Sequence, residues 1–208
     1  MAGSRIALID DHQAVRQALG DLLEVYGYDV ARYESAEDFL ADPHRSTIGC
    51  VISDVRMPGM DGIALVQALA ATSGAARIPA ILISGQADIP MAVTALKAGA
   101  ADFIEKPVDD VRLVAAINRA LVRPAQTPDQ TPDQTLAEVT ARFDRLTPRE
   151  LKVFDMIADG HTSQSIASNL GISVRTVEGY RAQLMEKLQL TSIAAVVRLA
   201  IRLGRVSP

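Results

Sequence analysis

Charged and polar residues follow short apolar runs at four places in the first half of the chain. In chain order they are Asp10 and Asp11 after residues 6–9, Asp54 after residues 51–53, Ser84 after residues 80–83, and Lys106 shortly after residues 101–104. Short apolar runs that alternate with helical patterns predict a parallel α/β sheet. Ligands of such sheets bind beyond the carboxyl ends of the strands. We therefore expect these five side chains to converge on one site.

The residue types at this expected site suit phosphoryl transfer. Clustered carboxylates repel one another unless a cation lies among them, and charged oxygen ligands favour Mg²⁺. Asp54 can act as a nucleophile toward phosphorus and form an acyl phosphate. The metal and Lys106 would offset the charge on the transferring oxygens. The Ser84 hydroxyl would hydrogen-bond the bound phosphoryl group and so sense it.

Each of these residues also has a purely structural interpretation. The three aspartates could cap helices, and Ser84 with Gly85 could form a turn. Lys106 before Pro107 could be a solvated side chain at a rigid bend. The conjunction of an acidic pair, a third acid, a hydroxyl and a lysine at one sheet edge favours the phosphoryl-transfer site.

The elements that would position these residues alternate between strand and helix. Strands are predicted near residues 4–9, 28–32, 49–53, 79–83 and 101–104, and helices near residues 13–26, 35–41, 61–72, 88–98 and 109–122. Five consecutive βα units predict an α/β fold with a doubly wound, five-stranded parallel sheet of the flavodoxin-like kind.

The pattern of residues 140–208 predicts a small all-α domain. Thr147, Pro148 and Glu150 form a helix start with a capping box. Helices are then predicted from Thr147 to Gly160, over residues 163–170, over residues 174–188 and over residues 191–203. The middle two are joined by a turn at Gly171 with Ser173 as the next N-cap, which describes a helix-turn-helix.

Between the two domains lies a segment rich in proline. Thr-Pro-Asp-Gln occurs twice in tandem at residues 127–134, and such polar, Pro-rich sequence does not build a core. We therefore expect domains at residues 1–123 and 140–208 with a linker at 124–139. The first domain carries a net charge of −5 and the second +4, so the second is the better candidate for an anionic partner.

The composition narrows the class of protein. The 208 residues contain no run of 18 apolar residues, so no membrane span is predicted. Asp10 and Asp11 come too early for a secretory signal. The single cysteine, Cys50, excludes an internal disulfide and is expected to be an inert core thiol. These features together predict a cytoplasmic protein.

Residues 1–122 resemble the receiver domain of two-component response regulators. The strand-end residues above, the loop 55–62 and the step Lys106-Pro107 carry the resemblance. It implies that Asp54 is the phosphoacceptor, assisted by Lys106 and Ser84. The step from Lys106 to Pro107 would be a cis peptide.

The same resemblance implies a metal site and a switch. The ligands of Mg²⁺ would be Asp10, Asp11, Asp54 and the backbone carbonyl of Arg56. Ser84 and Phe103 would be the switch residues, although from the sequence alone Phe103 reads as a core aromatic.

Residues 140–208 resemble the LuxR-type helix-turn-helix, and the whole chain resembles a response regulator of the FixJ subfamily. The helix at 174–188 would enter the major groove of DNA. The expected DNA-binding residues are Gln164, Arg175, Thr176, Glu178, Gly179, Arg181, Ala182, Gln183 and Lys187. Their basic side chains suit phosphates or guanine, Gln183 suits adenine, and Glu178 could accept a hydrogen bond from cytosine.

The chain departs from the family pattern in this domain, because the family often has Asn-Lys at Ser163-Gln164 and a bulkier residue at Gly179. A helical bundle that only dimerises is the alternative.

The resemblance implies a phosphorylation-activated, DNA-binding transcriptional regulator. A bacterial histidine kinase would phosphorylate Asp54 and so promote receiver dimerisation, through the face formed by residues 88–98, 101–104 and 109–122, and operator binding. The chain would be no enzyme beyond the self-phosphorylation and autodephosphorylation of Asp54. Double-stranded DNA and a second copy are further expected partners, and RNA polymerase is another candidate.

Two other classes compete with this interpretation. A phosphohydrolase with an aspartate nucleophile typically has a second Asp two residues later, where this chain has Arg56. A binding module that titrates a kinase and uses its second domain only for assembly would lack salt-dependent DNA affinity.

Overall fold

The computed structural model describes residues 4–71, 78–85, 89–122, 136–190 and 192–206. The chain divides into two compact units, one of residues 1–87 with 98–126 and one of residues 88–97 with 127–208. We describe the sheet-containing unit and the helical unit separately.

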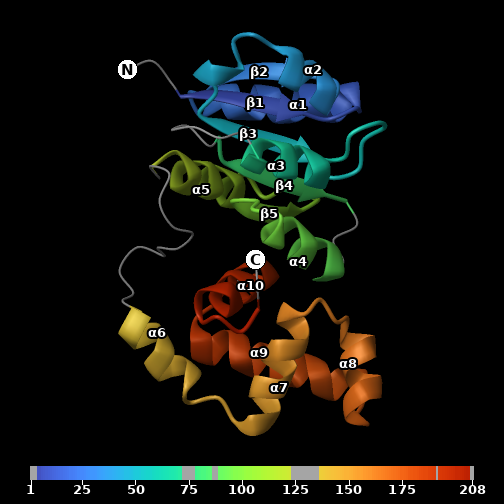
Figure 1. The fold of residues 1–208 in the computed structure, drawn as a ribbon, viewed down its shortest axis with the longest axis vertical. Helices are drawn as coiled ribbons and strands as arrows, with labels where there is room; N and C mark the ends of the chain where they lie inside the picture. Colours follow the sequence, from blue (N-terminus) through green and yellow to red (C-terminus); the bar gives the residue numbers. More distant parts are fainter. Residues whose placement is uncertain (1–3, 72–77, 86–88, 123–135, 191, 207–208) are drawn as a thin grey trace. The chain divides into compact units, whose positions relative to one another are not determined.

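The first unit is built on a five-stranded, all-parallel sheet with the order β2-β1-β3-β4-β5 (Figure 1). The strands are β1 (Arg5–Ile9), β2 (Asp29–Tyr33), β3 (Cys50–Asp54), β4 (Ala80–Ser84) and β5 (Asp102–Glu105). The strand order reverses at the pair β1 and β3, and such a switch point is where doubly wound sheets bind ligands. The predicted fold class is confirmed.

Helices connect the strands as the sequence pattern indicates. They are α1 (Gln13–Val25), α2 (Ala36–Ala41), α3 (Gly62–Ala71), α4 (Ile89–Lys97) and α5 (Asp110–Leu121), with a short 3-10 turn at Arg45–Thr47. Ser35 and Asp109 cap the starts of α2 and α5 through their side chains. These boundaries differ from the predicted ones by one residue or none, apart from the unpredicted 3-10 turn.

One part of the core of this unit lies between the sheet and the helices α1 and α5, and the strands are buried because helices cover parallel sheets. Its buried members include Ile6, Leu8, Leu23, Ile52, Ile81, Ile83, Ile104, Leu113 and Ile117. Cys50 is buried in the same core, and burial raises the pKa of its thiol to about 12. The prediction of an inert core thiol is consistent with this environment.

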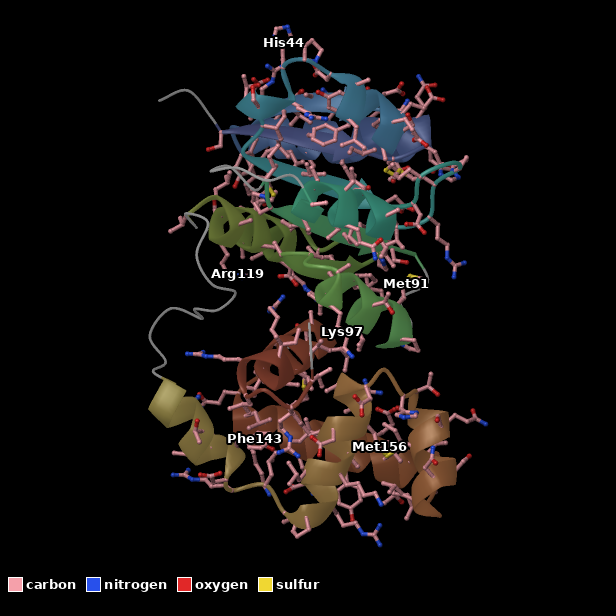
Figure 2. All side chains as sticks on the ribbon, viewed as in Figure 1. His44, Met91, Lys97, Arg119, Phe143 and Met156 are labelled. Atoms are coloured by element: carbon pink, nitrogen blue, oxygen red, sulfur yellow. The ribbon has the colours of Figure 1, made fainter. Side chains whose placement is uncertain are left out.

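Besides α4, the second unit contains the helices α6 (Leu136–Phe143), α7 (Pro148–Ala158), α8 (Ser163–Leu170), α9 (Val174–Leu188) and α10 (Ile193–Arg202). Phe143 and Phe154 pack edge to face with ring centroids 5.0 Å apart, and Figure 2 shows Phe143 where α6 ends. The buried core includes Val153, Phe154, Ile157, Ile166, Val177, Leu184, Leu188 and Val196. The helix α6 is not among the helices predicted from the sequence, and it begins inside the expected linker, of which residues 124–135 lie outside the described residues.

The helix starts and turns of this unit follow the sequence signals. Thr147 and Glu150 form the predicted capping box ahead of α7. Ser173 accepts a hydrogen bond from the backbone N–H of Thr176 at the start of α9. Gly171 ends α8 at a φ of 65°, a backbone conformation that glycine adopts without steric cost. The helix-turn-helix is confirmed.

The helices of the described ranges do not combine the length and apolar character that crossing a bilayer requires.

Candidate functional site

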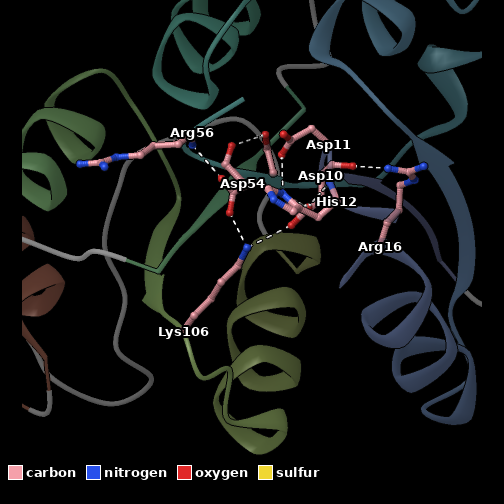
Figure 3. Close-up of polar contacts among 8 residues, drawn as sticks. Asp10, Asp11, His12, Arg16, Asp54, Arg56 and Lys106 are labelled. Carbon is pink, nitrogen blue, oxygen red and sulfur yellow. Dashed lines mark hydrogen bonds and ion pairs between the residues drawn. The ribbon is translucent and has the colours of Figure 1, made fainter. Parts of the chain in front are cut away.

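The carboxylate of Asp54 lies at the carboxyl end of β3, where Lys106 and Arg56 contact it (Figure 3). Its Oδ1 accepts a hydrogen bond from the Lys106 ammonium at 2.5 Å, and its Oδ2 accepts one from the backbone N–H of Arg56 at 2.7 Å. Asp54 is 8% exposed, so these contacts hold an almost buried charge. A lysine and a backbone amide therefore fix the orientation of the predicted nucleophile.

Lys106 also joins Asp54 to the acidic residue that follows β1. The ammonium donates to Asp10 Oδ2 at 3.1 Å, so both carboxylates share one cation. Burial by itself would lower the pKa of Lys106, but the hydrogen bonds that it donates to Asp54 and Asp10 outweigh burial and hold this pKa above its ordinary value. Lys106 is therefore a fixed positive charge beside Asp54.

Asp10, Asp11 and His12 form a compact cluster beside this pair (Figure 3). One possible ligand atom from each residue lies within 4.8 Å of the others. The backbone N–H of His12 donates to Asp10 Oδ1 at 2.9 Å, and His12 Nδ1 lies 2.9 Å from Asp11 Oδ1. The guanidinium of Arg16 donates to the backbone carbonyl of Asp10. His12 was missed by the sequence analysis, although it directly follows the acidic pair.

This donor set fits a hard divalent cation. Asp10 is 2% exposed and Asp11 is partly exposed, so the cluster combines a buried carboxylate with one open to solvent. Carboxylate and carbonyl oxygens with room for water are the ligands Mg²⁺ takes. Asp10 of this cluster and Asp54 both contact the Lys106 ammonium, so these two predicted metal ligands lie together at the same edge of the sheet.

Ser84 and Phe103 occupy neighbouring strands of the sheet. Ser84 is the last residue of β4 and is paired in register with Glu105, and its carbonyl accepts the backbone N–H of Lys106 at 2.8 Å. Phe103 is buried in β5 and is paired with Leu82. The peptide bond between Lys106 and Pro107 is cis, as the resemblance implied.

The predicted DNA-binding residues lie mostly on one exposed face of the helix-turn-helix. Gln164, Arg175, Thr176, Glu178, Gly179, Ala182, Gln183 and Lys187 are exposed, and Arg181 is half-buried. The opposite face of α9 buries Val177, Leu184 and Leu188. An exposed polar face on the second helix of a helix-turn-helix is the geometry that enters a major groove.

Glu178, Arg181 and Lys187 are among the predicted residues that bind partners within the unit itself. Arg181 donates to Ser163 Oγ at 2.5 Å and to Glu178 at 3.1 Å, which ties α9 to the start of α8. Lys187 lies 2.7 Å from the buried carboxylate of Glu150 on α7. These pairs give Arg181 and Lys187 a structural task beside any contact with DNA.

Val174 is an exposed residue of this face that the sequence analysis missed. It is the first residue of α9 and is 43% exposed. Its position beside Arg175 could have pointed to it, since apolar side chains at a helix start contact thymine methyl groups in major grooves.

Comparison with known proteins assigns both units to families. Residues 6–118 match the response regulator receiver domain, and residues 144–200 match the bacterial regulatory proteins of the luxR family. The transcriptional regulatory protein FixJ of Bradyrhizobium diazoefficiens is 40% identical over 202 residues, covering 97% of both chains. The response regulator protein TodT of Pseudomonas putida is 39% identical and covers 96% of this chain and 86% of its own.

A solved structure agrees with these relatives. Full-length FixJ from B. japonicum aligns over 100% of both chains with 37% identity and a TM-score of 0.55. This chain therefore belongs to the two-component response regulators that join a receiver domain to a LuxR-type DNA-binding domain, and it is a phosphorylation-activated transcriptional regulator.

Proposed function

We propose that Asp54 is the phosphoacceptor of this regulator. A carboxylate oxygen of Asp54 would attack the phosphorus of a phosphohistidine on a histidine kinase, forming an acyl phosphate as the imidazole leaves. The observation that carries the proposal is the fixed contact of Asp54 with Lys106 and with the Arg56 amide at the sheet's switch point. Loss of the phosphoryl group to water would be the only other chemistry of the chain.

We propose that Asp10, Asp11, Asp54 and the Arg56 carbonyl hold Mg²⁺. The acidic cluster beside Asp54 supports this assignment. The metal would supply positive charge to the phosphoryl oxygens. Lys106 and Ser84 would bind the phosphoryl group from the side of β4 and β5, and Lys106 is already positioned by Asp54.

We propose that Ser84 and Phe103 pass the state of Asp54 to the surface of the receiver. Both are buried and stand on adjacent strands, Ser84 at the end of β4 and Phe103 inside β5. A phosphoryl group adds negative charge and acceptor oxygens, which is sufficient to bias an element that has two arrangements. The result would be pairing of two receivers.

We propose that α9 reads the major groove of an operator, with α8 supporting it. Arg175 and Gln183 are exposed and suit base edges, while Gln164 suits a phosphate or sugar. Paired receivers would present two such helices to a two-fold DNA site. RNA polymerase is a further candidate partner, and the DNA target implies the bacterial cytoplasm.

We propose domain limits of residues 1–123 and 140–208 with residues 124–139 between them. The family matches at residues 6–118 and 144–200 lie inside these limits.

The test compares the native chain with Asp54→Asn, each with Mg²⁺ and beryllofluoride, a stable mimic of a phosphoryl group. A duplex selected from a random-sequence pool by the beryllofluoride-treated native chain serves as the probe. Sedimentation reports dimerisation and fluorescence anisotropy reports DNA affinity. We expect both to increase for the native chain and to stay at the untreated level for Asp54→Asn. Equal responses of the two proteins would remove Asp54 as the switch.

A further inference from the structure

Glu37, on α2, contacts the loop that follows Asp54. Its Oε1 accepts a hydrogen bond from the backbone N–H of Met60 at 2.8 Å, across 23 positions of sequence. Glu37 is exposed, and the start of α2 is capped by Ser35 through the N–H of Asp38. Neither core packing nor helix capping therefore accounts for the bond to Met60.

Gly59, at the tip of the loop, also lies close to this carboxylate. A side chain at Gly59 would place its Cβ 2.6 Å from the same Oε1 atom. Gly59 also has a φ of +75°, which side-chain-bearing residues rarely adopt. The loop tip thus meets Glu37 with both a backbone donor and a glycine that leaves space for the acceptor.

The two ends of the loop are bound to each other, and one of them is bound to the sheet. The backbone N–H of Gly62 donates to the carbonyl of Val55 at 2.9 Å, and the N–H of Val55 donates to the carbonyl of Ile83 at 2.9 Å. A Cβ at Gly62 would lie 2.4 Å from the carbonyl oxygen of Asp54. With its ends closed in this way, the loop has its tip at Gly59 and Met60, where Glu37 holds it.

Arg56 lies between the anchored end and the tip. Its N–H binds Asp54 Oδ2 at 2.7 Å, so movement of the loop would disturb both Asp54 and the Arg56 carbonyl. We propose that Glu37 is a positioning residue for the magnesium site, because it fixes the loop that carries the Arg56 carbonyl. This inference rests on the proposed function, in which that carbonyl binds the metal. Partners of metal ligands commonly influence affinity in this way.

The experiment measures Mn²⁺ binding to the full-length chain by the electron paramagnetic resonance signal of free Mn²⁺. We expect Glu37→Ala to weaken binding about tenfold, the low end of the loss for partners of metal ligands. Glu37→Gln keeps an acceptor oxygen for Met60 and should stay within about twofold of the native chain. Asp38→Ala, which removes the neighbouring acid of the same helical turn, should also stay within about twofold, as exposed charges contribute little.

Hydrogen exchange at the Met60 amide in the metal-free chain gives a second readout that needs no metal. It should be faster in Glu37→Ala and in Gly59→Ala, whose new Cβ would displace the carboxylate, but not in Asp38→Ala. Unchanged Mn²⁺ affinity or unchanged Met60 exchange in Glu37→Ala would overturn the inference. Equal losses of affinity in Glu37→Ala, Glu37→Gln and Asp38→Ala would also overturn it, because charge alone would then explain them. If the native chain itself binds no Mn²⁺, the proposed metal site is wrong, whereas the Met60 exchange still decides whether Glu37 holds the loop.

Discussion

Lys106 places a positive charge between two carboxylates that the proposed function assigns to a metal. Its ammonium contacts Asp54 and Asp10, so it competes electrostatically with an incoming cation. We expect Lys106→Met to bind Mn²⁺ more tightly, by about 1 kcal/mol or roughly fivefold in Kd. The same titration of Lys152→Met, which removes an exposed lysine of α7, should match the native chain. Weaker binding by Lys106→Met would mean that the lysine organises the ligands rather than competing with the metal.

At the residue scale, the site residues that could be predicted from the sequence are those that follow the ends of strands. Asp54 and Lys106 could be predicted to meet because parallel strands bring their carboxyl ends to one edge. Glu37 could not be assigned in this way. Glu37 reaches Met60 only because α2 and the loop after β3 are placed together in three dimensions, and no periodicity encodes that contact. The role of Lys187 beside Glu150 likewise depends on how α7 packs on α9.

At the element scale, Glu150 joins the capping of α7 to the packing of α9. Its carboxylate accepts from the Thr147 N–H and lies 2.7 Å from Lys187. Burial would raise the pKa of Glu150, but the hydrogen bonds from Lys187 and Thr147 outweigh it and lower this pKa below 4.5. Ionised Glu150 therefore contributes stability that is fully present above pH 4.5 and is lost as the pH falls through its lowered folded pKa.

We expect Glu150→Gln to lower the free energy of unfolding at pH 7 by about 1–2 kcal/mol, because a charged hydrogen-bond acceptor becomes neutral beside a partly solvated lysine. Urea unfolding at pH 7 and at pH 4 should show the gap between the native chain and the variant narrowing in acid. Glu186→Gln, at an exposed acid of α9, provides the control. A gap that stays constant over this pH range would contradict the assigned role of Glu150.

Gly179 lies in the middle of α9, and glycine in the interior of a helix lowers its stability. A Cβ added there meets no atom within 4 Å, so alanine fits without strain. We expect Gly179→Ala to raise the free energy of unfolding by about 1 kcal/mol, the difference in helix propensity. Thermal unfolding followed by circular dichroism measures the change, with Ala182→Gly, on the same exposed face, expected to shift stability in the opposite direction. A neutral or destabilising Gly179→Ala would show that α9 is not a regular helix at this position.

Element type was predictable where periodicity and caps agreed, as in α7, where Thr147, Pro148 and Glu150 all mark the start. The helix α6 was not predicted. Its eight residues follow the Thr-Pro-Asp-Gln repeats, and so short a helix has little stability of its own. It depends on tertiary contacts such as the packing of Phe143 on Phe154, which a single sequence does not display.

At the scale of the whole molecule, the two hydrophobic cores are drawn from separate stretches of chain. The core of the sheet unit uses residues between Ile6 and Leu121, and that of the helical unit uses residues between Phe143 and Val206. The net charge also divides, with −5 on residues 1–123 and +4 on residues 140–208. A core that is complete within one segment can fold without the other, and a basic segment can bind DNA alone.

We therefore expect a fragment of residues 136–208 to fold cooperatively in isolation and to bind duplex DNA with an affinity that falls steeply with salt. Urea unfolding followed by circular dichroism tests folding, and anisotropy titrations at two salt concentrations test binding. A fragment with Arg175→Ala and Gln183→Ala is the matched control, since both side chains are exposed on α9 and their loss leaves the core intact.

A broad, non-cooperative unfolding transition of the fragment would mean that the helical unit needs the rest of the chain to fold. If the fragment folds but its DNA affinity does not depend on salt, or if the control binds DNA equally well, α9 is not the helix that reads DNA. A folded fragment that binds with the predicted salt dependence would locate DNA recognition in the helical unit, so that phosphorylation of the receiver needs only to control how often two such units reach one operator.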